Sequence, residues 1–361
     1  MIFRNRLKTT IFLLFLVLGG ISTSTQTNYA YLGEPPKLFE FPVISKQEIE
    51  TSDIQVYLPI ILSPAEPLPW VDILDKDAVE QLYVTEYMTS EGVSSGWTGN
   101  HANCNPGTTS DAFREAVLRR INYFRSMSGI PPVTAFKDEY NQRAQSAALM
   151  MSTNKQLDHT PPETWLCYSA DGYEGASSSN LYLGVYGPSA ISGYVYDPGS
   201  GNYPVGHRRW ILYPQTQYMG TGDVPSQDGY PASNALWVFD RDNMWGERPT
   251  TREAFVAWPP AGYVPRQVVY PRWSFSYPQA DFANAMVTIT RSDQTVGVSV
   301  SPVVNGYGEN TLVWELNEAI PEDDVVYGVT IGNVLVNGVA QAFTYQVRII
   351  TLTHYENNEM K

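Results

Sequence analysis

The chain has 361 residues, of which 43% are hydrophobic and 17% charged, so it is long enough for about two globular domains and is not disordered throughout. Its formal net charge is −14 at pH 7. That charge argues against nucleic acid as a main partner and against anionic membrane surfaces, because binding to phosphate groups needs a basic face.

The first residues have the pattern of a secretory signal. Arg4, Arg6 and Lys8 precede an apolar run, Ile11–Ile21, and small polar residues follow. The run is shorter than the roughly 20 residues needed to cross a bilayer, so the pattern predicts a signal peptide at residues 1–25. An uncleaved anchor is the alternative. We therefore expect a secreted, extracellular protein, free or associated with the cell surface, with no transmembrane segment once the signal is removed.

Residues 26–100 are predicted to be a proline-rich extension or linker. Seven prolines fall between residues 31 and 70, and each removes a backbone donor and fixes φ. Within this stretch, Val56–Leu62 is apolar enough to dock as an edge strand, and residues 70–100 have weak helical character followed by a Gly/Ser turn cluster.

The chain has two cysteines, Cys104 and Cys167, and both lie in the part expected to be exported. An even number of cysteines in an oxidising compartment predicts one disulfide. Two unpaired thiols are the alternative.

Two helices are expected next. Ser110 is a suitable N-cap for a helix over 110–128, with Asp111 in its first turn and apolar residues at helical spacing. Gly129 and the prolines that follow it end this helix. A second helix is expected over about 138–153, with a face of small residues, Ala144, Ala147 and Ala148, that allows close packing.

The pattern of residue types changes after residue 270. Short alternating strands separated by Gly, Asn and Asp turns predict an all-β antiparallel sandwich, immunoglobulin-like, over 271–361. We predict that this domain is a spacer or an adhesion module, because none of its residues suggests a ligand.

Several common catalytic motifs are missing from the sequence: it has no Walker loop, no HExxH and no CxxC pair. A pair of histidines, His159 and His207, is the remaining candidate for chemistry. Neutral imidazole is a ligand for Zn²⁺ and a base near pH 7. Because two histidines leave a tetrahedral zinc short of ligands, a carboxylate or water must complete such a site, and Glu163, Glu174 and Asp197 are the candidate carboxylates. Two histidines hydrogen-bonded in an aromatic core are the alternative.

Arg208 and Arg209 directly follow His207. They are candidates for binding an anionic ligand, or for pairing with the acidic residues in which the chain is rich.

Four segments follow one another along the chain. The first carries an Asn-x-x-Arg pair, Asn122 and Arg125, and the others are "AQSAALMMSTNKQLDH", "SSNLYLG" and "VGHRRWILYPQTQYMGTGDV". In this order they resemble the CAP superfamily, which includes the cysteine-rich secretory, antigen-five and pathogenesis-related-1 proteins, and in particular its bacterial secreted branch.

The resemblance implies an α+β fold: an α-β-α sandwich over about 101–270, followed by the β-sandwich. It also implies a cleft lined by His159 and His207 that can hold a divalent cation, often zinc. In this sequence Ser179 takes the place of the family's cleft glutamate, while Asn180 keeps the asparagine. Serine is a poor zinc ligand, so the usual cleft chemistry of the family is expected to be altered.

We therefore expect an extracellular protein whose cleft binds a divalent cation or a small or lipidic ligand, or which contacts a surface protein. Two alternatives stay open. One is a metal-assisted, peptidase-like hydrolase that uses the cleft histidines, so whether the protein is an enzyme is undecided. The other is a structural cell-surface protein without a working site.

Overall fold

The structure is a computed structural model that describes residues 69–352, all of which belong to one compact unit. The predicted signal peptide, the first part of the proline-rich extension and the expected strand at 56–62 lie outside the described residues. Within residues 69–352, no helix combines the length and the apolar character needed to cross a bilayer.

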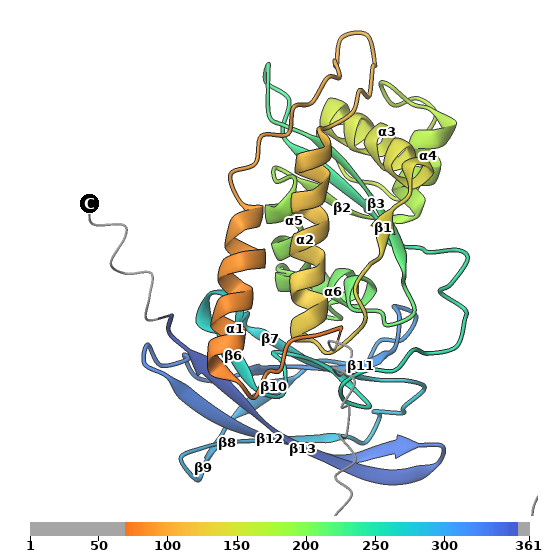
Figure 1. Cartoon of the computed structure of the whole chain (residues 1–361). Helices are drawn as coiled ribbons and strands as arrows, with labels where there is room; N and C mark the ends of the chain where they lie inside the picture. Colours follow the sequence, from red (N-terminus) through yellow and green to blue (C-terminus); the bar gives the residue numbers. More distant parts are fainter. Residues whose placement is uncertain (1–68, 353–361) are drawn as a thin grey trace, which may run out of the picture. The chain divides into compact units, whose positions relative to one another are not determined.

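The part of the chain that precedes the β-sandwich contains helices around one four-stranded sheet with the strand order β1-β3-β4-β2 (Figure 1). Its helices and strands are α1 (Lys76–Leu82), η1 (Tyr83–Tyr87), η2 (Met88–Ser90), α2 (Asp111–Met127), β1 (Ala135–Phe136), α3 (Asp138–Asn154), α4 (Ala170–Ser177), β2 (Ser179–Leu183), α5 (Pro188–Tyr196), η3 (Ser200–Asn202), α6 (Gly206–Ile211), β3 (Tyr218–Val224) and β4 (Ser233–Trp237).

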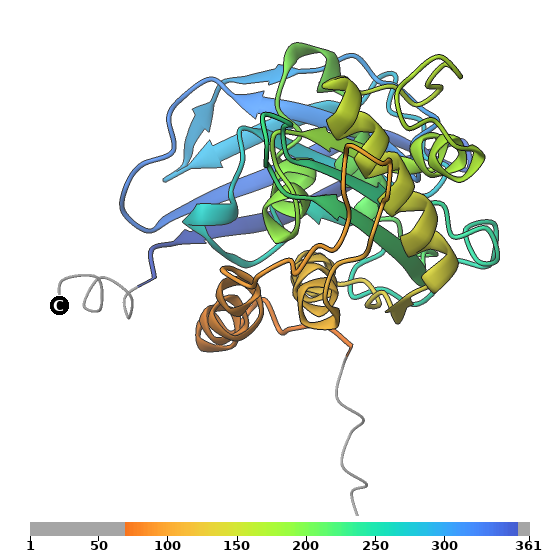
Figure 2. The ribbon, with the colours of Figure 1, turned by 90° about the horizontal axis from the view of Figure 1, so that it is seen from above.

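The predicted N-cap of α2 is confirmed. The Ser110 side chain accepts a hydrogen bond from the backbone N–H of Phe113 at 3.3 Å, and Asp111 lies in the first turn, where its charge suits the helix dipole. Helices α1 and α2 run beside each other in both views of the ribbon (Figures 1 and 2). Residues 76–90 of the predicted extension are therefore helical and pack on the helical layer.

Helix α3 covers one face of the sheet through small residues, as its sequence predicts. Ala144, Ala147 and Ala148 are fully buried. A Cβ atom added at Gly222 of β3 would lie 2.1 Å from the backbone carbon of Ala144, so only glycine allows this approach. This close contact fixes the distance between α3 and the sheet.

The opposite face of the sheet is covered by α2 and α5. Ala235 and Trp237 of β4 belong to the core cluster that includes α3, whereas Leu236 belongs to the cluster that includes α2 and α5. Since successive side chains of a strand point to opposite faces, the sheet lies between two helical layers. The expected α-β-α sandwich is confirmed.

A β-sandwich follows, also as expected. Its sheets have the strand orders β10-β11-β7-β5 and β6-β13-β12-β8-β9. The elements are β5 (Val256–Trp258), β6 (Tyr263–Pro265), η4 (Arg266–Val268), β7 (Arg272–Tyr277), β8 (Met286–Arg291), β9 (Gln294–Val296), β10 (Val298–Val300), β11 (Asn310–Leu316), β12 (Val325–Val336) and β13 (Val339–Ile350).

The sandwich differs from the sequence-based expectation in two respects. It is not wholly antiparallel, because β6 pairs with β13 in parallel. Its sheets also recruit β5 and β6, which precede residue 271, because β5 pairs with β7 and β6 with β13. Short strands of three residues carry too little alternating pattern to be assigned to a sheet from sequence alone.

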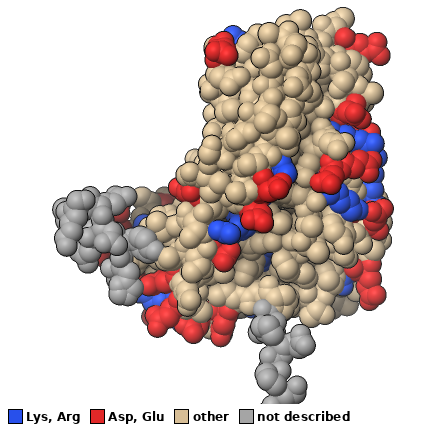
Figure 3. Space-filling model, turned by 45° about the horizontal axis from the view of Figure 1, so that its top comes forward, with Lys and Arg blue, Asp and Glu red and all other residues tan. Residues whose placement is uncertain are grey.

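Positive and negative side chains are interspersed on the face drawn in Figure 3. Charged side chains also form ion pairs among the described residues: Arg143 lies 2.8 Å from Glu139 and 3.0 Å from Glu174. Such exposed pairs contribute little to stability, but they neutralise cations that would otherwise attract anionic partners.

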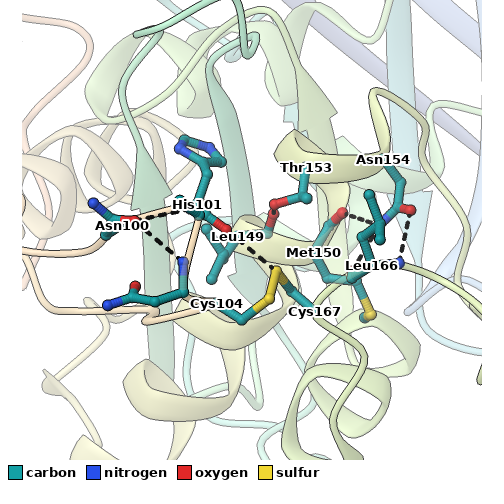
Figure 4. Close-up of a disulfide and its surroundings, with 11 residues drawn as sticks. Asn100, His101, Cys104, Leu149, Met150, Thr153, Asn154, Leu166 and Cys167 are labelled. Carbon is teal, nitrogen blue, oxygen red and sulfur yellow. Dashed lines mark hydrogen bonds between the residues drawn. A yellow bond between two sulfur atoms is a disulfide. The ribbon is translucent and has the colours of Figure 1, made fainter.

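The predicted disulfide between Cys104 and Cys167 is present, with the two Cα atoms 5.0 Å apart (Figure 4). Beside it, the Asn154 side chain bonds both the N–H and the carbonyl of Leu166, at 3.0 and 2.9 Å. The amide therefore holds the segment between α3 and α4, which carries His159, to the end of α3, and the disulfide ties the same segment to the loop before α2.

Removing the disulfide is expected to destabilise the protein substantially. In the double variant Cys104→Ser/Cys167→Ser, the free energy of unfolding should fall by about 4 kcal/mol, because the bridge closes a loop with a sequence separation of 63. Urea unfolding under oxidising conditions measures this. An unchanged midpoint would show that the loop is held by its other contacts alone.

Candidate functional site

The short helix α6 carries His207, Arg208 and Arg209, and it is anchored at both ends. It begins after Val205, whose backbone adopts left-handed dihedrals (φ 47°) although valine disfavours them. A strained backbone conformation of this kind persists only where surrounding contacts enforce it. Around α6 these contacts come from buried arginine side chains.

Arg125 of α2 fixes the C-terminal end of α6 and the segment that follows. Its guanidinium is fully buried and donates to the carbonyl oxygens of Ile211 (2.8 Å), Tyr213 (3.0 Å) and Thr216 (2.9 Å). Burial lowers the pKa of this guanidinium to about 9, so it remains charged at neutral pH. In the same helix, Asn122 pairs with the backbone of Val133 through both its oxygen and its nitrogen. The Asn-x-x-Arg pair is therefore structural.

Arg208 and Arg209 form no ion pairs with acidic side chains among the described residues, and both donate chiefly to backbone carbonyl oxygens. Arg208 donates to the carbonyl of Arg272 (2.8 Å) and to Ser274 Oγ (3.0 Å) in β7. Arg209 donates to the carbonyls of Val304 and Glu309 in the β10–β11 loop, at 2.7 and 3.0 Å. Both arginines connect α6 to the β-sandwich.

His207 is held by a buried carboxylate. Its Nδ1 lies 2.7 Å from Asp197 Oδ1, and its backbone N–H donates to Asp197 Oδ2 at 3.0 Å. Asp197 is 1% exposed and ends α5 in the left-handed conformation. With Nδ1–H donating to the carboxylate, the lone pair of a neutral His207 is on Nε2.

His159 is held in the same way by a backbone carbonyl. Its Nδ1 lies 2.8 Å from the oxygen of Ala176 at the end of α4. Because a carbonyl can only accept, Nδ1 carries the proton, and Nε2 of a neutral His159 has the free lone pair.

The structure brings both histidines to one cleft. It consists of two adjoining cavities of about 310 and 370 Å³, and His159, Asn202 and His207 line both. The predicted cleft residues Ser179 and Asn180 line the second cavity. We call the first the leucine cavity, because Leu157, Leu181 and Leu183 line it, and the second the Tyr307 cavity.

A polar network below the cleft supports His207 from its backbone side. The Asn180 amide donates to the His207 carbonyl at 3.1 Å, and the Tyr194 hydroxyl donates to Asn234 Oδ1 at 2.8 Å while lying 2.9 Å from the Asn180 carbonyl oxygen. Burial raises the pKa of the Tyr194 hydroxyl well above its ordinary value, so it acts as a neutral donor.

The three candidate carboxylates have other roles. Glu163 lines a separate cavity beside the disulfide. Glu174 pairs with Arg143 at 3.0 Å and with Arg241 at 2.6 Å. Asp197 uses both oxygens on His207. Among residues 69–352, no group of three or more His, Cys, Asp or Glu is placed to hold a metal ion. The side chains available for a metal ion are therefore the two imidazoles, and water or a ligand would have to complete the coordination. They do not fit a structural zinc site, in which four protein side chains bind the metal.

Several cleft residues are not apparent from the sequence. Asn202 and Tyr307 come from a 3-10 turn and a sandwich loop, and neither belongs to a motif in the matching segments. Asp197 was a candidate metal ligand, but the structure gives it the role of orienting His207. A Gly-Tyr-Gly turn, residues 306–308, was the one sequence signal that a ring is presented from a loop.

Comparison with known proteins gives one family match and one curated relative. Residues 118–240 match the family model described as the cysteine-rich secretory protein family, CAP. The Golgi-associated plant pathogenesis-related protein 1 of Homo sapiens is 25% identical over 146 residues, which cover 36% of this chain and 89% of that protein.

Two solved structures of PcoC, a methionine-rich copper resistance protein from Escherichia coli, also align. The first is 16% identical over 26% of this chain and 92% of that chain, and the selenomethionine form is 14% identical over 28% and 99%. Both alignments have a TM-score of 0.22, which supports no argument about fold or copper. The family match covers Asn122, Arg125 and both cleft histidines. Residues 118–240 therefore match the CAP family model, in agreement with the resemblance of the four motif segments.

Proposed function

We propose that the cleft binds a divalent cation such as zinc through Nε2 of His159 and Nε2 of His207. Water or an extracellular ligand would occupy the remaining coordination positions. The observation that supports this is that two histidines from distant segments line the same cavities, each with Nδ1 bonded to an acceptor. Histidine ligands in metal sites show this arrangement, since the acceptor fixes the tautomer and raises the basicity of the other nitrogen.

A second candidate function, hydrolysis, is favoured by the Asp197–His207 hydrogen bond of 2.7 Å. A carboxylate that orients an imidazole is the arrangement found around general bases. His207 would then remove a proton from a water molecule, and the cation would polarise the substrate carbonyl when bound. Turnover of a peptide library that depends on His207 would support this role.

Zinc titration tests the proposed cation site. His159→Ala and His207→Ala should each weaken zinc binding by at least about tenfold, because each removes one of two protein ligands. Isothermal titration calorimetry measures the change, with His354 replaced by Gln in every protein to remove a histidine outside the described residues.

His101→Gln is the matched control for this experiment. His101 is buried and its Nε2 bonds Ser152 Oγ at 2.9 Å, away from the cleft. Its replacement should leave zinc affinity unchanged. If the two cleft variants bind zinc like the parent, the cation site is wrong. A drop in melting temperature without a change in affinity would instead favour histidines that serve only the fold.

The role of Asp197 gives a separate prediction. Asp197→Asn keeps an acceptor oxygen near His207 but removes the negative charge that faces its Nδ1–H at 2.7 Å. Zinc affinity should fall about 10- to 100-fold, the range for ligand-supporting residues. Asp158→Asn is the control, because Asp158 lines the leucine cavity but accepts from the Thr160 N–H. Equal affinities for both variants would refute the positioning role.

We also infer that the mature protein acts outside the cytoplasm. The disulfide supports this, because such bonds persist in oxidising compartments, as does the basic-apolar pattern of residues 1–25. Protein recovered from the culture medium should begin, by N-terminal sequencing, shortly after the apolar run. Recovery only from the cell interior with Met1 intact would contradict this.

A further inference from the structure

The Tyr307 cavity is formed by both halves of the described structure. Most of its lining comes from the CAP domain, including both histidines, but Tyr307 belongs to the β10–β11 loop of the sandwich. The sandwich therefore contributes a side chain to the cleft, beyond the predicted role of a spacer.

Arg209 holds the loop that presents Tyr307. Its guanidinium donates to Val304 and Glu309, which lie on either side of Tyr307 in the chain, and is 5.4 Å from the centre of the Tyr307 ring. Gly306 and Gly308 flank the tyrosine at φ 101° and 55°, values that favour glycine. These constraints place the ring beside α6.

Gly206 makes room for that ring at the first turn of α6. A Cβ atom at this position would lie 3.0 Å from the Tyr307 ring, closer than ordinary contacts. The tyrosine is nevertheless 39% exposed, so part of it remains available to a ligand. The β10–β11 loop, Arg209 and Gly206 together fix Tyr307 as one wall of the cavity.

The lining of this cavity is polar and aromatic but carries no Lys, Arg, Asp or Glu. Three rings come from Trp210, Phe239 and Tyr307, and amides and hydroxyls come from Asn180, Asn202, Ser177 and Ser179. Ser179 is 4% exposed, and its Oγ has no hydrogen-bond partner among the described residues. Asn202 donates through its amide nitrogen to Pro198, which leaves its oxygen as an acceptor.

This combination fits a neutral saccharide. A sugar ring has apolar C–H faces that pack on aromatic rings and hydroxyls that pair with amides and serines. An anionic ligand would lack a cationic partner in this lining. An extended alkyl chain is better matched by the leucine cavity on the other side of the histidines.

We propose that the Tyr307 cavity is a subsite for a neutral saccharide, with the Tyr307 ring of the sandwich stacking on one sugar ring beside His159 and His207. The inference rests on the proposed function only in taking this cleft as the ligand site. It gives the sandwich a direct part in recognition and makes Tyr307 a specificity-determining residue.

Binding of defined hexasaccharides tests the proposal. The probes are neutral hexamers of β1→4 glucose, α1→4 glucose, xylose, mannose and N-acetylglucosamine, titrated by calorimetry against the full chain with and without zinc. At least one should bind. Tyr307→Ala should weaken that binding about tenfold, Tyr307→Phe only slightly, because the ring is kept. Tyr173→Ala is the matched control, because Tyr173 is also 39% exposed but lines neither cavity of the cleft.

The outcomes separate this proposal from the cation site. Tyr307→Ala should leave zinc affinity unchanged, since it removes no imidazole. If no hexamer binds at concentrations up to roughly 10 mM while zinc binding still depends on the two histidines, the saccharide subsite is wrong and the cation site stands. Saccharide binding unaffected by Tyr307→Ala would also overturn it. Tight binding of dodecanoate, with no binding of any hexasaccharide, would overturn the saccharide subsite as well.

Discussion

The arrangement of the cleft depends on three buried guanidiniums whose partners are chiefly backbone carbonyl oxygens. Arg125, Arg208 and Arg209 are each at most 4% exposed. Burying a charge is costly unless its donors are satisfied, and a guanidinium has five N–H donors in a fixed plane. Carbonyls from several segments accept most of these hydrogen bonds, and among the described residues only Nε of Arg209 in this set has no partner. The cost of desolvating the arginines thus fixes the path of the backbone around α6.

Helix α6 links the cleft to the sandwich because successive residues of a helix point in directions about 100° apart. His207 faces the cleft, while Arg208 bonds β7 and Arg209 bonds the β10–β11 loop. A six-residue helix has little stability of its own, so these contacts hold it in place. The position of the histidine is therefore coupled to the packing of the β-sandwich.

Features that depend on local pattern could be predicted from the sequence. The N-cap at Ser110, the small face of α3 and the pairing of Cys104 with Cys167 each follow from neighbouring residue types or from counting. The order of the motifs also indicated that His159 and His207 line one cleft. Features that depend on distant contacts could not be predicted. Arg208 and Arg209 looked suited to acidic partners, because a carbonyl acceptor leaves no trace in the sequence.

The same reasoning explains why the sequence predicts only a spacer or an adhesion module for the sandwich. Tyr307 lies about 100 positions beyond His207, and contacts distant in sequence, those of Arg209 among them, hold its loop beside α6. A tyrosine between two glycines is typical of an exposed turn, and nothing local distinguishes a turn that closes a cavity from one that faces solvent. Arg209 follows the cleft histidine by two residues, and the loop that it binds supplies Tyr307 to the cavity. His207 and the two arginines that follow it therefore act together. His207 faces the cleft, and Arg208 and Arg209 hold the sandwich against α6.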